Sequence, residues 1–437
     1  MYRDIMSELI KWKTSEGRKP LLVNGARQVG KTWLLQEFGR LHYNKVAYVL
    51  MSDNQRMSRL FAGTSDASTL ISGLEAEVGF SISPADTLII MDEIQEVPKA
   101  LSALKYFNEQ LPHYHIAVAG SLLGMALHEG ISFPVGKINS LTVFPMTFSE
   151  FVRAVKNEQL ATILQKSDRV LSSSFHDSFT ELLRQYLLIG GMPEAVKSFA
   201  QIGDYHQVRA IQKQILMDYE RDFSKHAPVA VVPRIRIVWN SLPSQLSRES
   251  KKFVYGAMKQ GARAKDFELA IQWLIDAGIV FRVQRVGKTG APLKHYEDLS
   301  AFKLFMLDVG LLGALSNLDL HLLLEGDILF TEFKGAYSEQ YVAQQLVAAG
   351  LPLYYYSSDN SKVEVDFITE IDGLPIPIEV KSASNLGSRS LTHFVGKQGI
   401  RRAVKLSLLE EKHNDIIINE PLYRAEHLAH LVRDSFS

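Results

Sequence analysis

Residues 22–34 read LVNGARQVGKTWL and place two glycines, a lysine and a hydroxyl between an apolar run and a helical pattern. Gly25 and Gly30 permit backbone angles that turn successive N–H groups inward around an anion. A helix that begins near Lys31 adds its positive end, Lys31 can reach outer phosphates, and the Thr32 hydroxyl can ligate Mg²⁺. We therefore assign a nucleotide-phosphate site to Gly25, Ala26, Arg27, Gln28, Val29, Gly30, Lys31, Thr32 and Trp33.

Two acidic residues follow a second apolar run. Residues 87–91 read TLIIM, which is typical of a buried strand, and Asp92 and Glu93 come directly after it. In phosphoryl transfer Asp92 can hold the metal through water, while Glu93 can polarise the attacking water. The same pair would suit a helix N-cap with a first-turn acid. Because the loop at 25–32 is present, we favour the catalytic interpretation.

Ser121 ends a third strand pattern. The segment HIAVA at 115–119 is followed by Gly120 and Ser121, so the hydroxyl lies at the tip of the expected strand. A hydroxyl at this tip would be close to the γ-phosphate and could sense it. A turn-forming Gly-Ser pair is the alternative.

A different set of reactive side chains lies in the C-terminal third, where residues 363–381 read VEVDFITEIDGLPIPIEVK. Asp372-Gly373 is a strong two-residue hairpin signal between two alternating runs. This turn sets Asp366 opposite Glu379, with Cβ atoms about 5 Å apart, and Lys381 on the same face. Two such carboxylates favour a divalent metal, and the lysine can support a nucleophilic water or a phosphate.

Glu339 adds a third carboxylate. It lies in the helical pattern GAYSEQYVAQQL, on the same stripe as three apolar residues, where a glutamate is a poor core residue. We assign it to the metal set with Asp366 and Glu379. The alternative is an ordinary cross-strand ion pair, because Glu364 is opposite Lys381 in the same register. The three apolar residues of the stripe are Val342, Ala343 and Leu346.

The elements between these two sets change character along the chain. Residues 161–245 are mostly helical in pattern, with an apolar stripe that begins at Phe179. Residues 246–318 then follow the order helix, helix, two-stranded ribbon, which is that of a winged helix. This stretch is locally basic and could contact DNA phosphates. A role in packing and oligomerisation is the alternative. The basic residues are Lys251, Lys252, Lys259, Arg263, Lys265, Arg282, Arg285 and Lys288.

The segments NGARQVGKT, IIMDEIQEVP, AVAGSLLGM, FPMTFSEF and LIGGMPEAV occur in this order. With them the chain resembles, over nearly its entire length, a prokaryotic group of AAA-type ATPases. In that group the ATPase is followed by an uncharacterised C-terminal domain that resembles PD-(D/E)xK restriction endonucleases. The first two segments are specific for ATP binding, and FPMTFSEF and GGMPEAV are specific mainly for the group. One departure is Gly136-Lys137, where the group usually has Gly-Arg, so the identity of an arginine finger stays open.

The resemblance implies an α/β fold with four parts. These are a parallel-sheet P-loop ATPase domain at 1–160, a helical lid at 161–245, a winged-helix-like module at 246–318 and a restriction-endonuclease-like domain at 319–437. In this arrangement Asp366, Glu379 and Lys381 correspond to the Asp…Glu-x-Lys set of the nucleases. ATP and Mg²⁺ are the implied cofactors.

Three functions agree with these patterns. The first is an ATPase whose nucleotide state controls the winged-helix and nuclease-like modules, acting on nucleic acid. The second is an ATP-dependent switch that binds a protein partner and has an inactive nuclease-like domain. The third is a scaffold that binds ATP with negligible hydrolysis. The sequence leaves open the substrate and the oligomeric state, homo-oligomers included.

Composition narrows the class of protein. The chain has 437 residues, of which 46% are hydrophobic and 22% charged, as in proteins that bury a sizeable core. Lys+Arg and Asp+Glu both number 48, so DNA contact requires a local patch. The chain has no cysteine, which excludes disulfides and thiolate metal sites. With no signal-peptide core and no run of 18 apolar residues, we expect a cytoplasmic protein without a membrane span.

Overall fold

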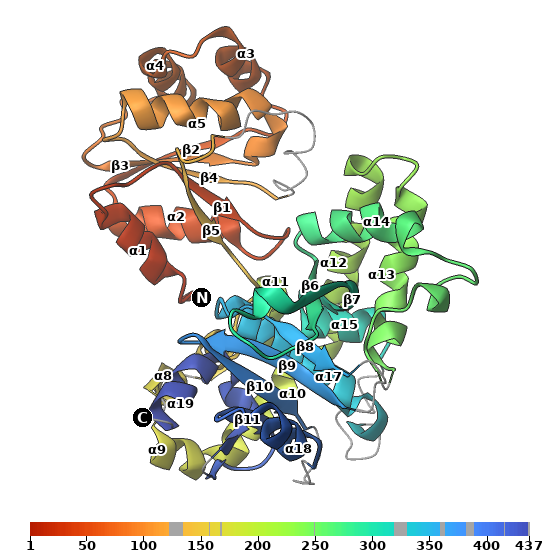
Figure 1. The fold of residues 1–437 in the computed structure, drawn as a ribbon. Helices are drawn as coiled ribbons and strands as arrows, with labels where there is room; N and C mark the ends of the chain where they lie inside the picture. Colours follow the sequence, from red (N-terminus) through yellow and green to blue (C-terminus); the bar gives the residue numbers. More distant parts are fainter. Residues whose placement is uncertain are drawn as a thin grey trace. The chain divides into compact units, whose positions relative to one another are not determined.

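The computed structural model forms two compact units (Figure 1). Unit 1 comprises Met1–Phe144 with Asp276–Ile279, and unit 2 comprises Pro145–Ile275 with Val280–Ser437. Among the residues that the structure describes, no helix combines the length and the apolar character that crossing a membrane requires. The structure describes residues 1–121, 134–156, 158–166, 168–248, 250–318, 330–358, 363–381, 389–414 and 416–435.

Unit 1 is built on a parallel sheet of five strands in the order β2-β3-β4-β1-β5. The expected strands and the helix start at Lys31 are confirmed. Helices α3 to α5 cover one face of the sheet, and α1 and α2 lie over the other (Figure 1). The strands are β1 (Leu21–Asn24), β2 (Lys45–Leu50), β3 (Thr87–Asp92), β4 (His115–Ala119) and β5 (Asn139–Thr142). The helices are α1 (Met6–Thr14), α2 (Lys31–His42), α3 (Gln55–Gly63), α4 (Ala67–Val78) and α5 (Pro98–Gln110).

Unit 2 contains a mixed sheet of eight strands in the order β12-β13-β11-β10-β9-β8-β6-β7. The ribbon expected as a wing is β6 and β7, which pair antiparallel. However, β6 also pairs in parallel with β8, where Gln284 is opposite Tyr354. The ribbon is therefore the edge of the sheet that carries the C-terminal hairpin, and no boundary between sheets falls at residue 318. The strands are β6 (Val280–Val286), β7 (Glu297–Met306), β8 (Tyr354–Ser357), β9 (Glu364–Ile371), β10 (Leu374–Val380), β11 (Ala403–Ser407), β12 (Lys412–His413) and β13 (Ile417–Pro421).

The helical segment expected as an ATPase lid belongs to unit 2. Its apolar stripe packs against C-terminal elements: the ring centroids of Phe179 and Tyr423 are 5.1 Å apart, and those of Tyr186 and Tyr341 are 5.6 Å apart. The helices of unit 2 are α7 (Phe148–Val155), α8 (Glu158–Lys166), α9 (Arg169–Ser174), α10 (His176–Ile189), α11 (Pro193–Ile202), α12 (Tyr205–His226), α13 (Val232–Leu246), α14 (Ala264–Asp276), α15 (Val309–Leu315), α17 (Phe330–Ala348), α18 (Arg389–Gln398) and α19 (Leu428–Ser435).

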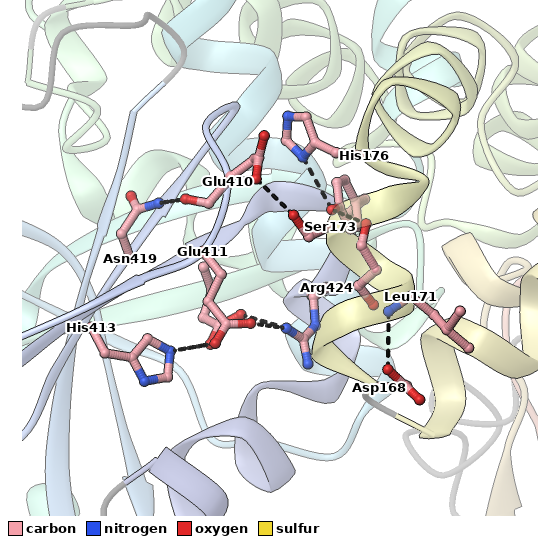
Figure 2. Close-up of polar contacts among 12 residues, drawn as sticks. Asp168, Leu171, Ser173, His176, Glu410, Glu411, His413, Asn419 and Arg424 are labelled. Atoms are coloured by element: carbon pink, nitrogen blue, oxygen red, sulfur yellow. Dashed lines mark hydrogen bonds and ion pairs between the residues drawn. The ribbon is translucent and has the colours of Figure 1, made fainter.

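Polar contacts join α9 and α10 to the segments between and after the C-terminal strands (Figure 2). The Ser173 hydroxyl at the end of α9 donates to Glu410 Oε2 at 2.7 Å. His176 Nδ1 at the start of α10 is hydrogen-bonded to the Tyr423 hydroxyl at 3.1 Å. Tyr423 lies in the short 3₁₀ helix Leu422–His427 that follows β13. These contacts explain why α9 and α10 form part of unit 2.

The segments FPMTFSEF and LIGGMPEAV meet at a buried polar network inside unit 2. Asp308, which is fully buried, accepts from the Gly191 N–H at 2.6 Å and from the Leu311 N–H at 3.0 Å. Gln344 Nε2 donates to the same carboxylate at 3.1 Å. A Cβ at Gly191 would lie 2.1 Å from the Met146 carbonyl oxygen, so that position requires glycine. These two segments therefore have a structural role in this network.

We expect Asp308→Ala to destabilise unit 2 by about 3 kcal/mol, because buried N–H donors lose their acceptor. The measurement is urea unfolding of the full chain. Asp204→Ala is the control, because Asp204 caps α12 at an exposed position and its loss should cost only about 1 kcal/mol. Equal effects of the two substitutions would contradict the role given to the network.

Candidate functional site

The loop between β1 and α2 has the backbone of an anion-binding turn. Gly25 and Gly30 have φ angles of 139° and 92°, in the region that favours glycine. A Cβ at Gly25 would lie 2.3 Å from the carbonyl oxygen of Val143, the residue after β5. Gly25 is therefore required both by its φ angle and by the close approach of a neighbouring chain segment.

Arg3, which the sequence interpretation missed, supports this loop. Its Nη1 donates to the carbonyl oxygen of Val29 in the loop at 3.0 Å, and its Nη2 donates to that of Phe144 at 2.7 Å. The side chain is buried. An isolated arginine near the N-terminus gives no signal of this role, because both acceptors are backbone atoms distant in sequence.

Lys31 lies inside the loop. Its Nζ donates to the carbonyl oxygens of Gly25 at 2.9 Å and of Ala26 at 2.7 Å. Burial lowers the pKa of Lys31 to about 8, against the opposing effect of the nearby Glu93 and Asp92 carboxylates. A phosphate in the loop could replace the two carbonyls and would favour the charged ammonium.

Thr32 and Asp92 meet at the C-terminal edge of the sheet. The Thr32 hydroxyl donates to Asp92 Oδ2 at 2.7 Å. Tyr48, at the adjacent strand β2, donates its hydroxyl to the same oxygen at 3.0 Å, and it was not identified from the sequence. Burial, and then the Asp92 carboxylate, raise the pKa of Tyr48 to about 12. The hydroxyl and carboxylate oxygens of Thr32 and Asp92 are ligands that Mg²⁺ prefers.

Glu93 and Ser121 are also brought together. The Ser121 hydroxyl donates to Glu93 Oε2 at 3.4 Å, and Arg27 Nε donates to the Ser121 hydroxyl at 3.3 Å. Gln95 Nε2 donates to the same Glu93 oxygen. Glu93 has a φ of 53°, an unfavourable region for this residue and one that is common at functional sites. Of the assigned loop residues, Gln28 and Trp33 have exposed side chains.

Lys137 lies just before β5, at the N-terminal ends of the parallel strands. Asn139, at the start of β5, is opposite Leu21 at the start of β1, whereas the phosphate loop follows the end of β1. Lys137 Nζ forms an ion pair with Glu109 Oε1 at 2.8 Å. It therefore lies away from the phosphate loop of its own chain.

In unit 2 the hairpin register predicted from Asp372-Gly373 is confirmed. Ile371 is opposite Leu374, and Phe367 is opposite Ile378. This register, continued by one residue beyond the last pair of the ladder, sets Asp366 opposite Glu379. The Val380 N–H donates to Asp366 Oδ2 at 2.8 Å, and Lys381 Nζ lies 2.8 Å from Glu379 Oε1.

Two further lysines, not assigned to this site from the sequence, face these carboxylates. Lys251 Nζ lies 2.6 Å from Glu339 Oε1, and Lys303 Nζ lies 3.7 Å from Glu339 Oε2. Lys303 Nζ is also 2.9 Å from Glu364 Oε1. The ion-pair alternative expected Glu364 to pair with Lys381. In the structure Glu364 pairs with Lys303 instead. A single lysine in the apolar strand pattern around residue 303 was the available signal for this pairing.

The electrostatics of the patch leave a place for a cation. Burial raises the pKa of Asp366 to about 7, with the Glu339 carboxylate as the next cause, while Lys303 acts in the opposite direction. In the described part of the chain, Glu339 Oε2 and Glu379 Oε2 are buried without a hydrogen-bond partner. Glu379 Oε2 fits a divalent ion, whereas Glu339 Oε2 lies 3.7 Å from Lys303 Nζ, and Asp366, Glu339 and Glu379 do not form a tight three-ligand cluster among the described residues.

A tighter set of potential ligands lies near β12 and β13, where atoms of Glu411, His413 and Glu420 lie within 4.8 Å of one another. His413 Nε2 is 2.9 Å from Glu411 Oε1 (Figure 2). The buried Arg424 places Nη1 2.8 Å from Glu411 Oε2 and 3.0 Å from Glu420 Oε2. Because the guanidinium already compensates both carboxylates, we interpret this cluster as a structural ion network.

Comparisons with protein families match three separate parts of the chain. Residues 17–152 match an AAA domain. Residues 180–321 and 334–421 match two domains of unknown function, DUF8612 and DUF4143. No curated protein sequence gives a significant match. Together with the loop geometry, the first match supports an AAA-type P-loop ATPase in unit 1.

Solved structures give weaker similarities. The Walker-type ATPase PABY2304 of Pyrococcus abyssi is 15% identical, with a TM-score of 0.46, over 72% of this chain and 96% of that one. The Aeropyrum pernix ORC1 protein in complex with DNA is 13% identical, with a TM-score of 0.29, over 72% and 93%. PCH-2 of C. elegans is 12% identical, with a TM-score of 0.27, over 46% and 63%. These TM-scores are too low to carry an argument about function.

We expect Lys31→Ala to abolish measurable ATP binding, because it removes the cation from the phosphate loop. Calorimetric titration with ATP and Mg²⁺ is the measurement. Lys137→Ala is the matched control, since it removes a lysine from the opposite edge of the same sheet and should leave the affinity unchanged. Wild-type affinity in Lys31→Ala would contradict the site.

Proposed function

We propose that unit 1 binds and hydrolyses ATP with Mg²⁺, and that its nucleotide state controls unit 2, which acts on nucleic acid. The observation that carries the ATPase part is the 2.7 Å hydrogen bond between Thr32 and Asp92. It joins the start of the loop helix to the acidic end of β3, as a shared metal site requires. The AAA domain match over residues 17–152 supports the same proposal.

Each residue of unit 1 has a role in this proposal. Lys31 leaves the carbonyls of Gly25 and Ala26 and binds the outer phosphates. Thr32 and Asp92 hold Mg²⁺, which neutralises charge on the phosphates when it is bound. Glu93 orients the attacking water. The Ser121 hydroxyl, 3.4 Å from Glu93 Oε2, is in reach of the same reacting group and senses the γ-phosphate.

The nucleic-acid part is supported by charge on unit 2. A group of five lysines and arginines is exposed between α13 and the first turn of α14, a stretch whose sequence also has two acids, Glu249 and Asp266. Such a surface suits contact with DNA phosphates. For the patch on β9 and β10, we propose that Asp366 and Glu379 bind one divalent ion, with Lys381 beside the attacking water. The five exposed residues are Arg248, Lys252, Lys259, Arg263 and Lys265.

A second candidate is an ATP-dependent switch for a protein partner, in which the nuclease-like patch is inactive. One observation favours it. Lys251 and Lys303 already form ion pairs with Glu339 at 2.6 and 3.7 Å, so part of the carboxylate charge is compensated without a metal. Metal binding at Asp366 and Glu379 distinguishes the two candidates.

We expect Glu93→Gln to keep ATP affinity but to slow hydrolysis by on the order of a hundredfold or more, because a water-orienting base is lost. Phosphate release at saturating ATP is the measurement. Glu96→Gln is the control, because Glu96 is exposed three residues away. If Glu93→Gln hydrolyses ATP like the wild type, Glu93 is only a helix cap. If the wild type itself does not hydrolyse ATP, the result favours a scaffold that binds ATP without hydrolysis.

We expect Mn²⁺ to raise the melting temperature of the full chain by mass action, and Asp366→Ala to remove the part of that gain that comes from unit 2. The full chain is needed because a fragment from residue 320 would lack β6 and β7 of the same sheet. Since Mn²⁺ could also bind at Thr32 and Asp92, the comparison with Asp366→Ala is decisive. Asp434→Ala, which removes an exposed carboxylate, is the control.

An unchanged shift in Asp366→Ala would remove the metal proposal for this patch. Nicking of DNA by the wild type and not by Asp366→Ala would favour the nucleic-acid candidate. Metal binding without nicking, or no metal binding, would favour the protein-directed switch.

A further inference from the structure

Lys303 is a buried lysine that the proposed chemistry does not use. It lies in β7, its side chain is fully buried, and its Nζ is 4.9 Å from the centroid of the Tyr355 ring. An ammonium group taken out of water in this way is costly unless anionic partners compensate it. Its partners are Glu364 at 2.9 Å and Glu339 at 3.7 Å.

Lys251 completes the enclosure of Glu339 from a different part of the chain. It lies between α13 and the 3₁₀ turn Tyr255–Ala257, and its Nζ is 2.6 Å from Glu339 Oε1. Glu339 is itself buried on α17. Its two carboxylate oxygens therefore each face a different ammonium group, one supplied by β7 and one by the segment before α14.

The charge on this side of the patch balances without a metal. Glu339 and Glu364 bring two negative charges, and Lys251 and Lys303 bring two positive charges. On the other side, Glu379 pairs with Lys381 at 2.8 Å, and Asp366 accepts the Val380 N–H. Of the four carboxylates of this patch, Asp366 is thus the one for which the described residues provide no ion pair within 4 Å.

We propose that Lys303 and Lys251 are positioning residues that take the place of a second cation: they hold Glu339 and Glu364 and keep Glu339 off the metal. The part about the metal rests on the proposed function at Asp366 and Glu379. The patch is then preassembled and binds one divalent ion between Asp366 and Glu379, with Glu339 outside its ligand set. This replaces the assignment of Glu339 as a metal ligand from the sequence.

The test measures the melting temperature of the full chain, with EDTA and with Mn²⁺, for Lys303→Met. This variant shortens the unbranched side chain by one atom and removes its charge. We expect a loss of roughly 10 °C in EDTA, because Glu364 loses its ion-pair partner and the buried Glu339 keeps only Lys251. Mn²⁺ should restore at least half of that loss by occupying the vacated position. Lys252→Met, at an exposed neighbour of Lys251, is the control and should show neither effect.

A melting temperature of Lys303→Met equal to that of Lys252→Met would overturn the proposal. So would a loss that Mn²⁺ does not reduce, since lost packing alone would behave in that way.

A second test uses Glu339, and its first part does not depend on whether Lys303→Met folds. We expect Glu339→Gln to retain the wild-type Mn²⁺ shift. Where Lys303→Met folds, we also expect the double variant Lys303→Met/Glu339→Gln to lose less stability than the two single variants lose together. A Mn²⁺ shift present in the wild type and lost in Glu339→Gln would overturn the proposal, and so would additive losses. A wild type without any Mn²⁺ shift would contradict only the proposed metal, because the coupling of Lys303 with Glu339 is measured in EDTA.

Discussion

The hydrogen bond from Thr32 to Asp92 depends on the parallel pairing of the strands in unit 1. That pairing brings together the two side chains proposed to hold Mg²⁺. Because β1 pairs with β4 and β4 with β3, the loop after β1 and the acids after β3 emerge at the same edge of the sheet. Lys31, Ser121 and Glu93 reach that edge by the same rule. Removing the parallel register would separate Thr32 from Asp92, which lie 60 residues apart in sequence.

Both units concentrate costly buried groups at a few points and compensate them with named partners. In unit 1 Lys31 donates to two backbone carbonyls. A phosphate can replace these acceptors when a nucleotide binds. In unit 2 Asp308 is held by N–H donors, and Lys303 by Glu364 and Glu339. The first kind of compensation can be exchanged for a ligand, whereas that of Asp308 fixes the fold. The arrangement around Lys303 lies between these cases, because a metal could take the place of its charge.

What the sequence could predict follows from how local each signal is. The phosphate loop and the hairpin register were predictable, because the spacing from Gly25 to Thr32 and the Asp372-Gly373 turn specify their own geometry. Arg3, Tyr48, Lys251 and Lys303 were not assigned, because their partners are distant in sequence and no motif connects them. For the same reason the sequence predicted the helices of residues 161–245 and the ribbon of β6 and β7, but it did not predict that both belong to unit 2. That depends on α10 packing against Tyr423 and on β6 pairing with β8, which no local period encodes.

A structure of the full chain with a non-hydrolysable ATP analogue and Mg²⁺ tests the central claim most directly, because it reports the position of each proposed ligand. The account predicts that Lys31 Nζ has left the carbonyls of Gly25 and Ala26 for the outer phosphates. It also predicts that the Thr32 hydroxyl lies on Mg²⁺, with Asp92 bound through water and Glu93 facing the γ-phosphate. A nucleotide bound elsewhere, or a loop in which Lys31 still donates to the two carbonyls while nucleotide is present, would contradict it.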